Sequence, residues 1–323
     1  MRSFTVTEND RGRRLDRFVA ANAPKLPKSL LYKYVRTKRI KVNGKKCEID
    51  RRLEKGDLVE MYIGDEFFAP QEQRYDFLNA PRSLDVVYED DNILIADKKA
   101  GVLSHPDAGE YVDTLITRVR RYLYEKGEYD PAAENAFAPA LANRIDRNTG
   151  GLVIACKNAE ALRSVCDAIR DRRIGKKYLC VVIGCPPKRE DIVTLYMVKD
   201  EQKNRAFVYD APTPGGKTMI TGYRALDARD GLTLCDVTLH TGRTHQIRAT
   251  FAHLGCPLLG DGKYGRREDN KRFGGYKKQC LYAYALTFRV PPDDPVLGYL
   301  SGKTVETTSI WFRDAFYDGT LVR

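Results

Sequence analysis

The chain has 323 residues, of which 42% are hydrophobic and 31% are charged, and its formal net charge is +11. This length favours two domains, and this composition excludes a disordered or fibrous chain. No apolar run approaches the roughly 18 residues of a membrane helix. The N-terminal residues lack the apolar segment of a signal peptide, and the eight cysteines form no CxxC pair. We therefore expect a cytoplasmic protein with reduced thiols and no membrane association.

The positive charge is concentrated in the first fifth of the chain. Residues 1–64 contain 17 Lys and Arg against 8 Asp and Glu, a net charge of +9, whereas the remaining 259 residues hold 38 basic and 36 acidic side chains. A small basic module of this kind attracts a polyanion, and nucleic acid is the obvious candidate. The commoner explanation of a charge run is a solvated face without a partner, and that alternative stays open at this point.

The basic module has the pattern of a small α+β domain. Leu15, Phe18 and Val19 recur at helical spacing and are followed by helix-breaking prolines. The elements predicted after this first helix are a helix over residues 30–36, a strand over 40–42, a hairpin turn at Asn43-Gly44 and a strand over 58–63.

This order of elements resembles the S-four-type RNA-binding domain, which is named for a small-subunit ribosomal protein. The resemblance covers about residues 12–64 and depends on the stretches RTKRIKVNGKK and LEKGDLVEMYI. A generic α+β module is the alternative. The residues that the resemblance places on the RNA-facing side are Arg36, Lys38, Arg39 and Lys41. Residues 65–83 have no periodicity and contain two prolines, so we predict a linker between a domain over 1–64 and a domain over 84–323.

The larger domain alternates apolar strands with amphipathic helices. Its apparent strands outnumber its helices. In chain order, the predicted elements are strands over 84–89 and 93–97, a helix over 111–125, a loop over 126–138, a strand over 152–156, a helix over 159–173, strands over 176–182 and 234–239, and a helix from residue 244.

One aspartate in this domain has an unusual setting. Asp146 lies between Arg144 and Arg147, before a Gly-rich turn and a buried strand. Neighbouring positive charge favours the ionised form of a carboxylate. A structural ion pair is the simpler interpretation of this segment on its own. Farther along, His245 and Arg248 are three residues apart, so they share one face at the start of a predicted helix.

Four segments together carry a family resemblance. LDVVYEDDNILIADKKAGVLSHP, NRIDRNTGGLVIACK, KKYLCVV and HTGRTHQIRATFAHLGCPLLGD resemble the successive motifs of the RluA family of pseudouridine synthases, over about residues 84–290. The resemblance implies an α+β catalytic domain with a mixed, largely antiparallel sheet. It also implies that the protein isomerises uridine to pseudouridine in RNA. The N-glycosidic bond breaks and ring carbon five bonds to the same ribose carbon, so no cofactor is expected.

The resemblance also implies roles for individual residues. Asp146 matches the catalytic carboxylate, Arg248 the arginine that pairs with it, and Tyr178 the tyrosine that packs against the uracil ring. Whether the carboxylate attacks the base, attacks the sugar or removes a proton stays open. Plain core packing is the alternative for Tyr178. The residues of this domain expected to contact RNA are Arg144, Arg243 and His245; for Arg243, bracing the fold is an equal alternative.

Three positions depart from the family pattern. Asn143 stands where the family has His, Gly150 where it has Ser, and Lys99 where it has Pro after Lys98. None of the three replaces the proposed catalytic residues. We therefore expect activity, with a more flexible Asp146 loop and altered target choice.

Other functions fit the sequence less well. Gly216-Lys217-Thr218 resembles the end of a phosphate-binding loop, but Ala211 stands where the first glycine is required. His240, His245 and His253 match no set of metal ligands, so no metal is expected. A methyltransferase would need a Gly-rich loop after its first strand. A non-catalytic RNA-binding or ribosome-associated protein remains the main alternative. Large-subunit ribosomal RNA is the first-choice substrate, transfer RNA the second, and a monomer the default.

Overall fold

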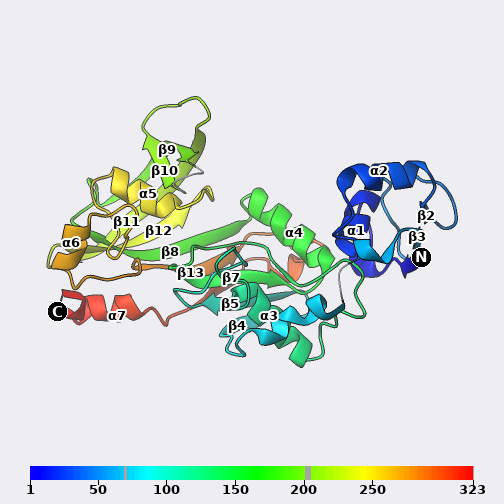
Figure 1. Cartoon of the computed structure of the whole chain (residues 1–323). Helices are drawn as coiled ribbons and strands as arrows, with labels where there is room; N and C mark the ends of the chain where they lie inside the picture. The colour runs from blue at the N-terminus through cyan, green and yellow to red at the C-terminus, as the bar shows by residue number, and fades with distance from the viewer. Residues whose placement is uncertain (69–70, 201–204, 323) are drawn as a thin grey trace.

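A small N-terminal domain and a large sheet-containing body make up the molecule, and they lie at opposite ends of it (Figure 1). The computed structural model describes residues 1–68, 71–200 and 205–322. No helix in this described part is long and apolar enough to cross a membrane.

The N-terminal domain packs two helices against a three-stranded antiparallel sheet. Its sheet has the order β1-β3-β2. Phe18 and Val35 are buried in its core, as the helical spacing of apolar residues predicts. The elements are β1 (Arg2–Thr5), η1 (Glu8–Asp10), α1 (Leu15–Asn22), α2 (Lys28–Arg36), β2 (Ile40–Val42) and β3 (Leu58–Met61).

The predicted turn at Asn43-Gly44 is confirmed. Both residues have left-handed backbones, with φ of 54° and 71°, the combination that a two-residue hairpin turn of type I′ requires. The Asn43 side chain donates to Asp57 Oδ1 at 2.7 Å and accepts from the Leu58 amide at 2.7 Å. The turn is therefore fixed to the start of β3.

Residues 65–83 do more than connect the two parts. They contain two 3₁₀ helices, η2 (Asp65–Phe67) and η3 (Gln71–Asn79). The ring of Phe77 is buried, 5.7 Å from the ring of Tyr124 on α3 (Leu115–Glu125). The segment lacks the apolar periodicity of an α-helix or a strand, so the sequence alone predicts a plain linker.

Polar contacts join the N-terminal domain to the body. Asn9 donates to Glu134 Oε1 at 2.6 Å, and Arg13 donates to the Ala136 carbonyl oxygen at 2.8 Å. Asn135 donates to the carboxylate of the fully buried Asp10 at 2.9 Å. These hydrogen bonds fix the position of the N-terminal domain against the body.

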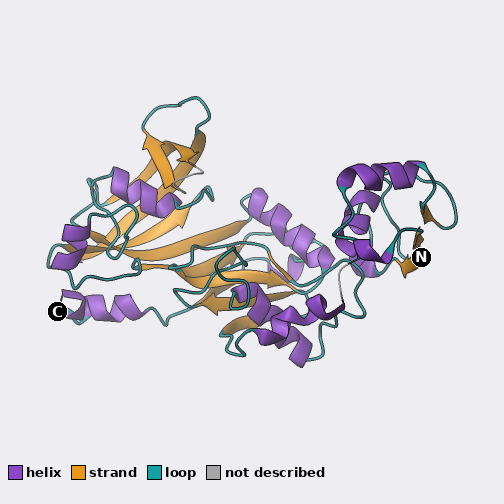
Figure 2. Cartoon of the chain, viewed as in Figure 1, coloured by secondary structure: helices purple, strands orange, loops and turns teal. Residues whose placement is uncertain are grey.

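A single mixed sheet forms the centre of the body (Figure 2). Within the described residues it has eleven strands, and its main path runs in the order β10-β9-β11-β12-β8-β13-β7-β5-β4. Among the strand pairings of the described residues, only that of β13 with β7 is parallel. The predicted largely antiparallel sheet is thus confirmed. The strands are β4 (Val86–Glu89), β5 (Ile93–Lys98), β6 (Ala140–Leu141), β7 (Gly150–Cys156), β8 (Ile174–Ile183), β9 (Glu190–Asp200), β10 (Arg205–Tyr209), β11 (Lys217–Arg229), β12 (Leu232–Leu239), β13 (Leu281–Phe288) and β14 (Thr304–Glu306).

Helices cover both faces of this sheet. Leu94 and Ala96 of β5 share a core with α3 and α5 (Gln246–His253). Ile93 and Ile95 point to the opposite face, where they pack with α4 (Ala159–Arg170). Alternate residues of a strand face opposite sides, so residues 93–96 of β5 are apolar and buried on both, whereas the strand ends in Asp97 and Lys98. The remaining helical segments are α6 (Arg267–Arg272), η4 (Gly298–Leu300), α7 (Trp311–Tyr317) and η5 (Thr320–Val322).

Three helix starts and one helix end differ from the predictions. The helix expected over 30–36 starts two residues earlier, at Lys28. The helix expected from residue 111 starts at Leu115, because the Thr114 side chain accepts from the Thr117 amide and caps it. The helix expected to reach residue 173 ends at Arg170, since Arg172 has a φ of 60°. The helix expected from residue 244 starts at Gln246, because His245 has a φ of 56°.

Candidate active site

Asp146 lies in the loop that joins β6 to β7. The Thr149 amide donates to the Asp146 carbonyl oxygen at 3.1 Å, which closes a tight turn. The Asp146 side chain is 27% exposed, so it is partly accessible to solvent and not sealed in the core.

Arg248 connects Asp146 to a second, buried aspartate. Its Nη1 donates to Asp146 Oδ2 at 2.8 Å. Its Nε and Nη2 donate to the two carboxylate oxygens of Asp261 at 2.7 and 2.9 Å. This fork-to-fork pairing fixes the guanidinium plane, and Arg248 therefore presents its remaining edge to Asp146 in one orientation.

The charges of this triad stabilise one another. Burial opposes the charge of Arg248, but the hydrogen bonds and charges of Asp261 and Asp146 raise its pKa above the ordinary value. Burial likewise opposes the charge of Asp261, and Arg248 outweighs it, so the pKa of Asp261 is lowered. Arg248 and Asp261 are therefore both ionised throughout the physiological pH range.

His245 lies beside the same carboxylate. Its Nε2 is 3.8 Å from Asp146 Oδ2, and its Nδ1 is 3.0 Å from the hydroxyl of Tyr264. Burial lowers the pKa of His245, and the charge of Asp146 only partly opposes this. The imidazole is therefore neutral at neutral pH. The left-handed backbone at His245 turns its ring toward Asp146 just before α5 begins.

Tyr178 on β8 belongs to the core beneath the site. It packs in the same cluster as Ile145 and Ile247, which flank Asp146 and Arg248. Burial raises the pKa of Tyr178, and the nearby charge of Asp146 raises it further. The predicted group of Asp146, Tyr178, Arg248 and His245 is thus brought together by three separate parts of the chain.

A buried lysine anchors the Asp146 loop. Lys98 is 1% exposed, and its ammonium donates to the carbonyl oxygens of Val102 at 2.7 Å, Arg147 at 3.0 Å and Lys99 at 3.1 Å. Burial lowers the pKa of Lys98 to about 7, although the charge of Asp146 acts in the opposite direction. The loop after β5 and the Asp146 loop are therefore held by one side chain.

Two further contacts hold the loop from either side. The Ser104 hydroxyl donates to the Ile145 carbonyl oxygen at 2.9 Å. Gln279 donates to the Thr149 hydroxyl at 3.1 Å. All these partners are buried, so the backbone on both sides of Asp146 is tied to the core.

The departures from the family pattern have structural explanations. The Asn143 side chain accepts from the Ile154 amide at 2.8 Å, which joins the loop to β7. A Cβ atom added at Gly150 would lie 2.5 Å from the ring of Tyr282, so that ring occupies the space of a side chain. The expectation that Gly150 makes the loop more flexible is therefore not supported by its packing. Lys99 is exposed and forms an ion pair with Asp85 at 3.4 Å.

The residues predicted to contact RNA fall into two groups. Arg144 and Arg243 are exposed near the Asp146 loop and α5, and Arg243 also donates to the Thr218 carbonyl oxygen at 3.2 Å. The other group lies in the N-terminal domain, away from Asp146 (Figure 1), and consists of Arg36, Lys38, Arg39 and Lys41. Arg39 and Lys41 lie over the rings of Tyr34 and Tyr62, at 5.3 and 5.0 Å.

Sequence reasoning assigned no role to Asp261, Lys98 or Tyr264. Asp261 lies 13 residues after Arg248 and is the last residue of the motif HTGRTHQIRATFAHLGCPLLGD. Its place in that motif was the signal available in the sequence. No cluster of three metal-ligating side chains occurs in the described part of the chain.

Comparison with known proteins identifies the family. The family model described as RNA pseudouridylate synthase matches residues 92–253, which include Asp146, Tyr178 and Arg248. The ribosomal large subunit pseudouridine synthase D of Escherichia coli (strain K12) is 33% identical over 269 residues, covering 81% of this chain and 76% of that protein. An uncharacterized RNA pseudouridine synthase of Bacillus subtilis (strain 168) is 28% identical over 288 residues, covering 89% of each chain.

Solved structures share the fold. The structure titled human RNA pseudouridylate synthase domain containing 4 superposes with a TM-score of 0.56 at 18% identity, covering 72% of this chain and 92% of that one. The structure of human RNA pseudouridylate synthase domain containing 1 superposes with a TM-score of 0.51 at 21% identity, covering 73% of this chain and 95% of that one. The chain belongs to the RNA pseudouridylate synthase family and is an RNA pseudouridine synthase.

Proposed function

We propose that this enzyme converts specific uridines of large-subunit ribosomal RNA into pseudouridine, with Asp146 as the catalytic carboxylate. The name of the 33% identical relative from Escherichia coli supports this choice of RNA. Transfer RNA is the second candidate substrate. The observation that carries the catalytic assignment is the chain of contacts from Asp261 through Arg248 to Asp146.

The geometry supports a catalytic role for one particular oxygen. Arg248 and His245 both approach Oδ2 of Asp146, and no hydrogen bond to Oδ1 is found among the described residues. In this proposal Oδ1 is the oxygen left to act on the substrate. The reaction breaks the bond from N1 of uracil to the ribose carbon and forms one from C5, while C5 loses a proton and N1 is left to gain one. A carboxylate held in one place by Arg248 suits this exchange, because nothing has to reorganise before it acts.

Tyr178 and Lys98 support the reaction in different ways. The target uridine must leave its stack to reach Asp146, and the flat ring of Tyr178 provides a surface for the extruded uracil. Lys98 holds the loop backbone next to Asp146 and acts as a positioning residue.

The N-terminal domain is proposed to be an S-four-type RNA-binding domain. Its two helices, its three-stranded sheet and its excess of positive charge fit that assignment. The side chains proposed to contact phosphates there are Arg36, Lys38, Arg39 and Lys41.

The test compares wild type with Asp146→Asn on purified large-subunit ribosomal RNA and, separately, on transfer RNA, with pseudouridines mapped in each. Asp293→Asn serves as the matched control, because Asp293 is exposed. We expect modification of defined ribosomal uridines by wild type and the control, and none by Asp146→Asn. Modification of transfer RNA alone would replace the proposed substrate. An active Asp146→Asn would overturn the catalytic assignment, and a wild type that binds both RNAs without modifying them would favour the non-catalytic RNA-binding protein.

A further inference from the structure

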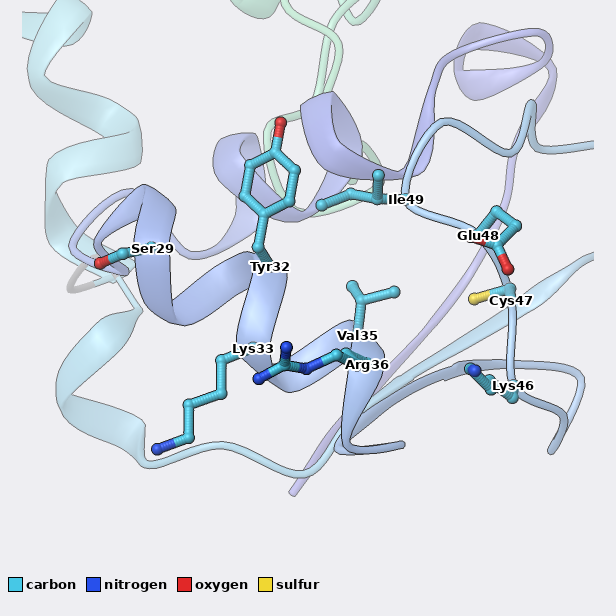
Figure 3. Close-up of a pocket in the computed structure, with 9 residues that line it drawn as sticks. All are labelled: Ser29, Tyr32, Lys33, Val35, Arg36, Lys46, Cys47, Glu48 and Ile49. Carbon is cyan, nitrogen blue, oxygen red and sulfur yellow. The ribbon is translucent and has the colours of Figure 1, made fainter.

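A pocket in the N-terminal domain has no assigned role. It lies between α2 and the segment over residues 46–49, and its volume is about 420 Å³. Figure 3 shows Tyr32 and Ile49 entering it from these two opposite walls, with the sulfur of Cys47 pointing toward α2. The volume lies within the roughly 300–1,000 Å³ of small-ligand sites, so the pocket can hold one nucleotide.

Three cations line the pocket without partners. Lys33, Arg36 and Lys46 are exposed, and none of them has an ion pair or a side-chain hydrogen bond within the described ranges. Elsewhere in the same domain, arginines are neutralised: Arg14 pairs with Asp16 and Arg51 with Asp57, each at 3.1 Å. The pocket is therefore a place where the positive charge of the domain remains available to an anion.

The pocket also offers an aromatic face above an apolar floor. Tyr32 is 46% exposed. Val35 and Cys47 are buried and close the bottom of the pocket. Glu48 adds a carboxylate at the wall, which accepts hydrogen bonds from the exocyclic amino group of a base. Cations beside an exposed aromatic ring are the combination by which proteins hold single-stranded nucleic acid.

We propose that this pocket binds one unpaired nucleotide of the substrate RNA. The base stacks on Tyr32, and the flanking phosphates lie against Lys33, Arg36 and Lys46. This inference rests on the proposed function, because it takes RNA as the ligand of the N-terminal domain. The inference goes beyond the proposed function, because it names a site, away from Asp146, that selects unpaired RNA. The competing outcome is that the domain recognises RNA by charge alone and binds paired and unpaired RNA equally.

The test measures the affinity of the full chain for a short single-stranded RNA of adenosine and cytidine, and for the same strand paired with complementary DNA. Neither ligand contains uridine, so binding is read independently of the reaction. We expect the single strand to bind more tightly, Tyr32→Ala to weaken it about 10-fold, and Tyr32→Phe to bind as wild type does. Tyr317→Ala on α7 is the matched control, because Tyr317 is 48% exposed at the opposite end of the molecule (Figure 1).

A second measurement follows the charges. Lys33→Gln and Lys46→Gln are each expected to reduce the slope of log Kd against log salt concentration by about 0.7, as expected for one lost phosphate contact to a single strand. Ultraviolet cross-linking of the wild type to the same RNA is expected to attach it at Tyr32 or Cys47. Equal affinities of Tyr32→Ala and Tyr32→Phe, or equal binding of paired and unpaired strands, would overturn the proposal. If the wild type bound the single strand as expected but formed no pseudouridine in ribosomal or transfer RNA, that result would count against the proposed function and not against this pocket.

Discussion

The Asp146 loop and the surface of α2 use charge in opposite ways. At the loop, Arg248 is buried and bound to two carboxylates, and its partner Asp261 is 2% exposed. On α2, Lys33 and Arg36 are exposed and pair with nothing in the described part of the chain. Charges that are buried and paired hold a fixed geometry, whereas exposed, unpaired charges attract a polyanion over a distance. We propose that the first region carries out the reaction and that the second captures RNA.

The largest effect is expected where the buried fork is broken. Arg248→Lys keeps the positive charge but cannot bind Asp261 with two nitrogens and Asp146 with a third. We expect the single-turnover rate to fall about 100-fold or more and the free energy of unfolding to fall by about 4 kcal/mol. Rapid-quench kinetics and urea unfolding measure the two quantities. Arg243→Lys is the exposed control, and an equal effect there would remove the distinction between buried and exposed charge.

A smaller effect is expected from restoring the family residue at position 150. Gly150→Ser places a side chain against the ring of Tyr282, which lies 2.5 Å from the position of the new Cβ. We expect the free energy of unfolding to fall by about 3 kcal/mol. The cost should largely disappear when the substitution is made together with Tyr282→Leu, which a double-mutant cycle measures. Additive effects of the two substitutions would show that the ring is not the obstacle.

The pH dependence of stability provides the next test. Lys98 has a pKa of about 7 in the folded protein because of its burial, and about 10.4 when unfolded. Between these values the unfolded chain binds more protons, so this lysine makes the free energy of unfolding rise with pH. From pH 7 to 9 the rise is about 2 kcal/mol. The Lys98→Met variant should lack this rise. If the free energy of unfolding changed with pH in the same way in both proteins, the lowered pKa of Lys98 would be contradicted.

The smallest effect on the free energy of unfolding is expected at the contact between the N-terminal domain and the body. Asn135→Ala removes a donor from the buried carboxylate of Asp10, at a cost of about 1 kcal/mol. Amide hydrogen exchange should accelerate around β1 and η1 and stay unchanged in β7, which the core of the body protects. Unchanged exchange at both places would mean that the domain is held by its other contacts, such as those of Arg13.

Sequence reasoning located the main residues of the site but not their support. Asp146, Arg248 and His245 lie in short contiguous motifs that can be recognised from the sequence alone. Lys98 binds three backbone carbonyl oxygens, one of them 49 residues away, and no periodicity reveals that contact. The strands β9, β10 and β11 also escaped prediction. Their residues alternate between exposed and half-buried over much of their length, so no continuous apolar run marks them.

The position of the single tryptophan has a practical consequence for unfolding studies. Trp311 begins α7, and its ring lies 5.7 Å from that of Tyr276, at the end of the molecule farthest from the N-terminus (Figure 1). Its fluorescence therefore reports the integrity of the body alone. The N-terminal domain could detach or melt without any change in that signal. A second tryptophan introduced at the exposed Tyr62 would give the N-terminal domain and the body each an optical reporter.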